Sequence, residues 1–320
     1  MPEPDCPWAH ACAPFAPTIE LRMREWLENY GLVQSDRMRA RIARANYGWL
    51  AARCYPYASI ERLQIIACYF GLYFLTDDLF VDRVETVSSQ TIPNLTAIIA
   101  LFDLDRLGSE PVYGEAAWVD LCQRMKPHMS AEHFWRFAHG MQMWAGAAGL
   151  QIIEHIHNQP IGLRQYETIR RHISGANPSL DLIDFANGNP LSPDEYHRPD
   201  VQQLRRHANN VISWSNDLHS LAMEISQPGQ NKNMVAIYMA QGCSIQAGVD
   251  RTADRIRGEI QAFVNEATAL RDHASTAILG YIEGLERWMA GYEAWVTNDT
   301  RRYARAFVGE DADDRDLVHT

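Results

Sequence analysis

Lysine is almost absent from this chain of 320 residues, which contains only Lys126 and Lys232. The formal net charge is −11, and the arginines occur in short, separated pairs rather than in one basic stretch. Proteins that follow a nucleic-acid backbone depend on clustered lysine and arginine. The composition therefore argues against nucleic acid as the partner.

The six cysteines show no CxxC spacing. Cys54 and Cys68 fall in apolar stretches, as is typical of reduced thiols in a cytoplasmic protein. The segment "DCPWAHAC" could form a metal clip from Cys6, His10 and Cys12, but no second Cys/His cluster accompanies it. We instead expect residues 1–17 to form a loose N-terminal arm.

Targeting and membrane-spanning patterns are also missing. No basic segment precedes an apolar run and a cleavage site of small residues. The uncharged run from Ile65 to Thr76 is too short to span a bilayer and predicts a buried helix. We expect a soluble, cytoplasmic protein without membrane insertion.

Alternating strand patterns, linkers and internal repeats are absent, whereas apolar residues recur every three or four positions almost throughout. One such apolar face runs from Ile256 to Trp295. We expect one all-α domain over residues 18–305, followed by an acidic, disordered tail at 306–320. The other expected helices cover residues 18–30, 36–54, 59–82, 91–107, 113–124, 131–157, 163–174, 178–187, 199–226 and 231–240.

The segment "FLTDDLFVDRVE" places three aspartates at the end of the apolar run. On a helix Asp78 and Asp82 share a face, and Asp77 lies one step round. Carboxylates grouped in this way suit Mg²⁺, which commonly shares its coordination with a substrate phosphate. A solvated helix end explains the same pattern, and both readings stand at this point.

The segment "WSNDLHSLAME" carries a second polar stripe, formed by Asn216, Ser220 and Glu224. A step of four residues drifts only ~40° round a helix, so the three side chains share one face. All three offer oxygen ligands for Mg²⁺. The alternative is a polar, solvent-facing side, although Asn and Ser are poor choices for a helix interior.

These two segments resemble the DDxxxD and ND-x-x-S-x-x-x-E motifs of bacterial class I terpene synthases. Two further segments match that family in the same order. "YETIRRHISG" (166–175) resembles its diphosphate-sensing segment, and "RRY" (301–303) resembles its C-terminal Arg-Tyr pair. The resemblance covers about residues 20–305, and it implies a helical bundle around a central apolar cavity.

For the family's chemistry, the resemblance implies three Mg²⁺ ions, replaceable by Mn²⁺, that hold the diphosphate of a prenyl diphosphate. Asp77 would be the main ligand of the first motif, with Asp78 and Asp82 as ligands or supporting partners. Asn216, Ser220 and Glu224 would together hold one ion. The diphosphate contacts would come from Arg170, Arg302 and Tyr303, with Arg171 as the alternative to Arg170.

The resemblance also implies a cavity wall that stabilises carbocations. We expect Tyr73, Phe74 and Trp295 to line it, because aromatic faces stabilise cations without acting as nucleophiles. Ser174 and Gly175 would form a helix break whose carbonyl faces the cation. Four tryptophans at helical spacing are read as equally compatible with ordinary core: Trp49, Trp144, Trp214 and Trp288.

The chain departs from the family pattern at three positions. Met223 precedes Glu224 where many relatives have lysine, which puts one diphosphate contact in doubt. Trp295 lies one residue further from the Arg-Tyr pair than expected. Ser174 stands where some relatives carry an aromatic residue, which would enlarge the cavity.

The resemblance predicts an enzyme that cyclises a linear prenyl diphosphate. Farnesyl diphosphate is the expected substrate, giving a sesquiterpene hydrocarbon or alcohol, and a diterpene cyclase using geranylgeranyl diphosphate is the alternative. The oligomeric state is left open, with a homodimer as one option.

Three other classes of protein fit less well. An isoprenyl diphosphate synthase needs a second Asp-rich motif and lysines for a second diphosphate. A di-iron bundle needs two Glu-x-x-His motifs, and only "EHIH" at 154–157 is present. A non-catalytic helical binding protein would not need the intact set of ligands.

Overall fold

The computed structural model describes residues 6–81, 87–104, 107–157, 161–224 and 233–303, and every regular element within these ranges is helical. The first helices are α1 (Ala16–Asn29), α2 (Asp36–Ala45), α3 (Tyr47–Cys54), α4 (Ile60–Phe80), α5 (Thr91–Leu104) and α6 (Glu115–Met125). A 3₁₀ turn, η2 (Lys126–His128), leads to α7 (Ala131–His157), α8 (Leu163–Ile173), α9 (Ala176–Asn187) and α10 (Pro193–Tyr196). The chain continues with α11 (Pro199–Glu224), α12 (Met234–Ala240), α13 (Ile245–Arg271), α14 (Thr276–Ala294) and a π-helical turn, η3 (Trp295–Asp299).

Several helices begin at a serine that caps the free backbone amides of the first turn. Ser59 accepts a hydrogen bond from the backbone N–H of Arg62 at the start of α4, and Ser275 does the same for Ile278 at the start of α14. Such caps fix where a helix starts more sharply than apolar spacing does.

The structure corrects two of the expected helices. Residues 36–54 form two helices, because Asn46 adopts a left-handed conformation with φ 56° between α2 and α3. The face from Ile256 to Trp295 belongs to α13 and α14, which are separated at 272–275. Apolar spacing continues across both breaks, so spacing alone did not reveal them.

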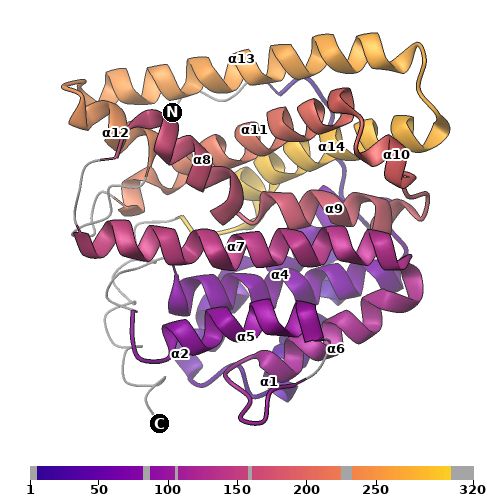
Figure 1. Ribbon diagram of the computed structural model, residues 1–320, viewed down its shortest axis with the longest axis vertical. Coiled ribbons are helices and arrows are strands. Elements are labelled where there is room, and N and C mark those ends of the chain that lie inside the picture. Colours follow the sequence, from indigo (N-terminus) through magenta and orange to yellow (C-terminus); the bar gives the residue numbers. More distant parts are fainter. Residues whose placement is uncertain (1–5, 82–86, 105–106, 158–160, 225–232, 304–320) are drawn as a thin grey trace.

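Helix α4 runs through the middle of the bundle and packs against α1, α3, α6 and α9 (Figure 1). The residues from Ile65 to Tyr73 are all buried, which explains why this stretch carries no charge. By length and composition α4 is the one helix in the described part of the chain that could cross a membrane. Most of its apolar window, 78%, is buried inside the protein, as expected for a core helix.

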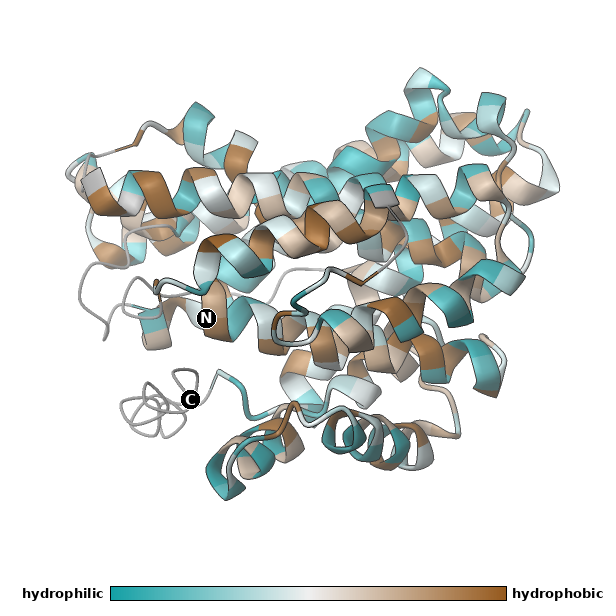
Figure 2. Cartoon of the chain, turned by 60° about the horizontal axis from the view of Figure 1, so that its bottom comes forward, coloured by the Kyte–Doolittle hydropathy of each residue, from teal (hydrophilic) through white to brown (hydrophobic). Residues whose placement is uncertain are grey.

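Helix α11 is the second central element. It packs against α13 and α14, and α13 lies along the outer edge of the molecule (Figure 1). Many helices carry hydrophobic and hydrophilic residues side by side along their length, as Figure 2 shows. The site described below lies between α4 and α11.

The N-terminal arm is less loose than expected where the structure describes it. Residues 6–15 form no long helix, but the Trp8 ring packs edge-on against Phe263 of α13, with 5.4 Å between ring centroids. The backbone N–H of Ala13 donates a hydrogen bond to the carbonyl of Ala52, 3.0 Å away. The acidic tail at 306–320 lies outside the described residues, and the domain boundaries remain a prediction.

Candidate active site

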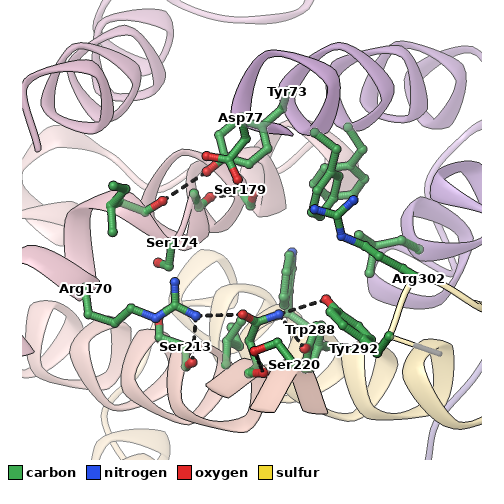
Figure 3. A pocket seen from close by; sticks show the side chains of 18 of the residues that line it. Tyr73, Asp77, Arg170, Ser174, Ser179, Ser213, Ser220, Trp288, Tyr292 and Arg302 are labelled. Carbon is green, nitrogen blue, oxygen red and sulfur yellow. Dashed lines mark hydrogen bonds between the residues drawn. The ribbon is translucent and has the colours of Figure 1, made fainter. Parts of the chain in front are cut away.

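A cavity of about 830 Å³, including the solvent at its mouth, opens between α4, the junction of α8 and α9, α11, α14 and the segment after η3. Asp77 and Tyr73 of α4 face Arg170, Ser213 and Ser220 across this cavity, and Arg302 enters from the side (Figure 3). The lining residues are Leu50, Phe70, Tyr73, Phe74, Asp77, Arg170, Ile173, Ser174, Gly175, Ser179, Ile212, Ser213, Asn216, Ser220, Met223, Glu224, Trp288, Tyr292, Arg302 and Tyr303.

The two adjacent aspartates of α4 take different positions. Asp77 lines the cavity. Asp78 is buried and forms ion pairs with Arg302, through contacts of 2.5 and 2.8 Å, and with Arg41 at 3.0 Å. Two guanidinium groups therefore occupy the oxygens of Asp78. Asp82 lies outside the described residues.

Arg302 is fixed in place although its sequence position lies near the end of the chain. Besides Asp78, it donates a hydrogen bond of 2.8 Å to the Tyr47 hydroxyl, and its guanidinium lies 4.9 Å from the centroid of the Phe74 ring. The rings of Tyr47 and Phe74 are themselves stacked, with centroids 4.5 Å apart. Burial on its own lowers the pKa of Arg302, but the charge of Asp78 outweighs it and raises that pKa, so the side chain stays cationic.

On the opposite wall, the three predicted ligands of α11 line the cavity together. The amide nitrogen of Asn216 donates to the hydroxyls of Tyr303, at 2.8 Å, and Tyr292, at 3.1 Å. The Ser220 hydroxyl donates to the backbone carbonyl of Asn216, 2.8 Å away, and this leaves its oxygen lone pairs as acceptors. One Glu224 oxygen accepts a hydrogen bond of 3.0 Å from Asn233.

Arg170 is held against α11 by a buried carboxylate. Its guanidinium lies 2.9 Å from an Asp217 oxygen and donates to the Asn216 side-chain oxygen at 2.7 Å. The other Asp217 oxygen accepts hydrogen bonds from the Tyr166 hydroxyl and from the backbone N–H of Met234. Burial raises the pKa of the Asp217 carboxyl, and the charge of Arg170 opposes that rise.

The predicted helix break is present beside these groups. Helix α8 ends at Ile173, and α9 begins after Ser174 and Gly175. Gly175 has φ 70°, and a Cβ atom added to it would lie 2.4 Å from the Tyr73 ring. The Tyr73 hydroxyl donates to the carbonyl of Ile173, 3.2 Å away. Only glycine satisfies both the left-handed backbone and this close approach.

Besides Asp78, two described residues of the predicted site do not line the cavity. Arg171 lines a different pocket, so the geometry selects Arg170 from the adjacent pair. Trp295 is fully buried behind the lining and donates a hydrogen bond from its indole nitrogen to the Asn46 carbonyl, 2.9 Å away. The π-helical turn begins at Trp295, and the Trp295 ring packs against two lining residues, Phe74 and Tyr303, with 6.4 and 6.1 Å between ring centroids.

Part of the aromatic wall lies outside the residues predicted from the sequence. Trp288 and Tyr292 of α14 line the cavity together with Phe70 of α4. From its sequence position, Trp288 is equally compatible with ordinary core. Its spacing of four residues from Tyr292 places both on one helix face. This spacing is the sequence signal that could have indicated a shared position in the wall.

The oxygen donors of the two walls fit a hard divalent cation. They comprise a carboxylate from Asp77 and an amide, a hydroxyl and a carboxylate from Asn216, Ser220 and Glu224. The described residues contain no group of three or more His, Cys, Asp or Glu side chains placed to hold a metal. A cation here would therefore depend on the amide and hydroxyl oxygens, which suits magnesium chemistry better than that of softer metals.

Comparison with known proteins agrees with this chemistry. Residues 68–262 match the family described as "Terpene synthase family 2, C-terminal metal binding". A (+)-corvol ether B/(+)-corvol ether A synthase of Kitasatospora setae, named as cyclising (2E,6E)-farnesyl diphosphate, is 54% identical, and the match covers 98% of each chain. A sesquiterpene synthase of Metarhizium brunneum is 51% identical over 99% of this chain and 93% of that protein.

Solved structures show the same fold at lower identity. A linalool/nerolidol synthase of Streptomyces clavuligerus, in complex with 2-fluorogeranyl diphosphate, superposes with a TM-score of 0.82 at 19% identity, covering 94% of this chain and 98% of that chain. An α-eudesmol synthase superposes with a TM-score of 0.80 at 21% identity, covering 92% and 98%. The fold is therefore the all-α class I terpene synthase fold, and by sequence the chain belongs to the terpene synthase family, whose matched domain binds metal.

Proposed function

We propose that this terpene synthase ionises farnesyl diphosphate, cyclises the resulting carbocation to a sesquiterpene hydrocarbon or alcohol, and releases diphosphate. The 54% identity to a synthase named for cyclising farnesyl diphosphate, across nearly the full length of both chains, carries the choice of substrate. The cavity supports the wider class of prenyl diphosphates, because its lining combines polar and charged side chains with an aromatic wall.

At the polar end, the diphosphate would be bound by Arg170, Arg302 and Tyr303. Guanidinium groups bind phosphate oxygens in a bidentate manner, and both arginines are held in place by buried aspartates. A phenol such as that of Tyr303 adds a hydrogen-bond donor to the leaving group.

The metal ions would be held by Asp77 on one wall and by Asn216, Ser220 and Glu224 on the other. We propose three Mg²⁺ ions, which Mn²⁺ could replace. Bound there, they neutralise the charge that develops on the departing diphosphate. We assign Asp78 to the support of Arg302 rather than to direct metal contact, and we keep Asp82 as a ligand or supporting carboxylate from the sequence motif.

At the apolar end, the hydrocarbon chain would lie against aromatic side chains. Tyr73, Phe74 and Trp288 line the cavity together with Phe70 and Tyr292. Their ring faces stabilise a cation without forming a bond to it. Ser174 and Gly175 would place backbone carbonyls at the break, where their dipoles stabilise positive charge at the adjacent wall.

The alternative substrate is geranylgeranyl diphosphate, because the small side chain of Ser174 would enlarge the cavity. The names of the relatives favour the C15 substrate instead. A soluble, cytoplasmic enzyme is also part of the proposal, because α4, the long apolar helix of the described residues, is mostly buried within the bundle.

The test is to incubate the purified protein and Mg²⁺ separately with the C10, C15 and C20 diphosphates and to analyse the products by gas chromatography–mass spectrometry. We expect cyclic C15 products in largest yield. Turnover of the C20 substrate alone would reject the sesquiterpene assignment. If none of the three substrates gave a product, the cyclase proposal itself would be wrong.

A further inference from the structure

A second pocket, of about 930 Å³ including open solvent, lies among α7, α8, α9, α10 and α11. We call it the basic pocket, because four arginines line it: Arg136, Arg171, Arg205 and Arg206. Asp181 is the one acidic side chain among its described lining residues. The pocket therefore has an excess of positive side chains, whereas the whole chain has a net charge of −11.

Two of the four arginines are already neutralised by neighbouring groups. Arg205 forms an ion pair of 2.7 Å with Asp181. Arg136 forms ion pairs with Glu132 and with Asp184, the second at 3.3 Å, and donates to the carbonyl of Leu191. These two arginines build the floor of the pocket and have little capacity for a ligand.

Arg171 and Arg206 differ from that pair. Within the described part of the chain, neither guanidinium has a hydrogen bond or an ion pair, although both line the pocket. Arg206 is exposed and Arg171 is half-buried, so both are open to an incoming ligand. Two uncompensated cations on adjacent helices, α8 and α11, therefore face one concave space.

Histidines add donors beside these cations. His139 and His172 line the same pocket, and the Nδ1 atom of His172 is buried without a hydrogen-bond partner. The pKa of His172 is lowered, first by burial and then by the positive charges of Arg171 and His139. This direction agrees with a positive electrostatic potential inside the pocket.

We propose that the basic pocket is a second binding site, for an oxyanion of the phosphate or diphosphate class, held by the guanidinium groups of Arg171 and Arg206. Planar guanidinium groups bind such oxyanions through paired N–H donors. The site is separate from the catalytic cavity, because Arg170 points into that cavity whereas Arg171 lines the basic pocket. The inference does not depend on the proposed cyclisation.

Isothermal titration of the wild-type protein with inorganic phosphate, and separately with inorganic diphosphate, tests the site. EDTA is present throughout, so that metal-dependent binding in the catalytic cavity is suppressed. The test variant is the double substitution Arg171→Gln and Arg206→Gln. The matched control is Arg22→Gln with Arg164→Gln, which removes the same charge from exposed positions that line neither pocket.

We expect at least one of the two anions to bind, and to bind the wild type and the control variant with the same affinity. The test variant should bind it about tenfold more weakly or worse, because charge-assisted hydrogen bonds are lost. Binding of both anions would identify a general phosphate site, whereas binding of diphosphate alone would restrict the site to diphosphate. Equal affinity of the wild type and the test variant, or equal weakening in the control, would overturn the proposal.

A second measurement localises the anion. In protein labelled with ¹³C-histidine, the imidazole signals of His139 and His172, assigned through His139→Gln and His172→Gln, should shift during the titration. No heat and no shift with either anion would also overturn the proposal. A protein that failed to cyclise any prenyl diphosphate but still showed these shifts would contradict the proposed function alone.

Discussion

Each of the two walls of the catalytic cavity uses a pair of adjacent residues, one to line the cavity and the next to hold an arginine. On α4, Asp77 lines the cavity and Asp78 holds Arg302; on α11, Asn216 lines the cavity and Asp217 holds Arg170. Consecutive positions on a helix are separated by about 100°, so one residue faces the cavity while the next anchors a guanidinium beside it.

The two walls differ in the kinds of group that contact the aspartate holding each arginine. Asp217 also accepts hydrogen bonds from Tyr166 and from the Met234 backbone, whereas Asp78 is bound by two guanidinium groups. The α11 wall thus joins three helices, α8, α11 and α12, around one carboxylate. The α4 wall ties the last described residues to the centre of the bundle.

The largest expected effect comes from removing the cavity-facing oxygens of α11. Asn216→Ala and Glu224→Ala should each lower kcat/KM by about 10²–10³-fold, by analogy with the loss of one preorganised electrostatic contact. Steady-state rates of diphosphate release measure the effect. Circular dichroism should show unchanged helicity, and retention of activity by either variant would refute the ligand assignment.

The next effect concerns the two anchors. Asp78→Asn and Asp217→Asn each leave a buried arginine without its counter-charge, so each should lower the free energy of unfolding by about 3–5 kcal/mol. Urea unfolding monitored by circular dichroism measures this. The control is Asp200→Asn, which breaks an exposed pair with Arg198 and should cost about 0–1 kcal/mol. Equal losses in all three variants would contradict the comparison of the walls.

A third prediction tests the close approach of Gly175, at the break between α8 and α9, to Tyr73 of α4. Gly175→Ala should destabilise the protein by about 1–3 kcal/mol, because the residue has a left-handed backbone and its Cβ would overlap Tyr73. Gly146→Ala in α7 meets nothing within 4 Å and should be neutral or stabilising by about 1 kcal/mol. Thermal unfolding of both variants measures the difference. If Gly175→Ala were as stable as Gly146→Ala, the close approach would be wrong.

The smallest effect concerns Glu20, a buried carboxylate outside the cavity that, unlike Asp78 and Asp217, does not hold a cavity arginine. Burial raises the pKa of Glu20 from 4.5 to about 7, against the opposing hydrogen bond from Gly48 and the charge of Arg24. The folded state therefore binds this proton more tightly than the unfolded state does. The resulting stability is fully present below pH 4.5 and is lost as the pH rises to about 7.

Glu20→Gln should remove this dependence on pH. Relative to the wild type, its free energy of unfolding should rise by about 1 kcal/mol between pH 6 and pH 7, and should change little above pH 8. Urea unfolding at a series of pH values gives this difference. A difference between the two proteins that did not change with pH would show that Glu20 is ionised throughout.

The sequence predicted the helical fold and most of the cavity lining, because its signals were local. Asn216, Ser220 and Glu224 share a face through helical spacing alone, and Gly175 was identified by a motif. The sequence could not choose between Arg170 and Arg171, because that choice depends on which neighbouring helix each one meets. It placed Trp295 in the lining because apolar spacing along a helix does not show which side chains of a face are covered by neighbouring rings.

The central claim is that this cavity cleaves a prenyl diphosphate and keeps the hydrocarbon for cyclisation. The most direct measurement quantifies inorganic diphosphate and cyclic C15 product in the same reaction with farnesyl diphosphate. The account predicts equal amounts of both in the presence of Mg²⁺, neither in EDTA, and recovery when Mg²⁺ is restored. Absence of diphosphate release in the presence of Mg²⁺ would contradict the account.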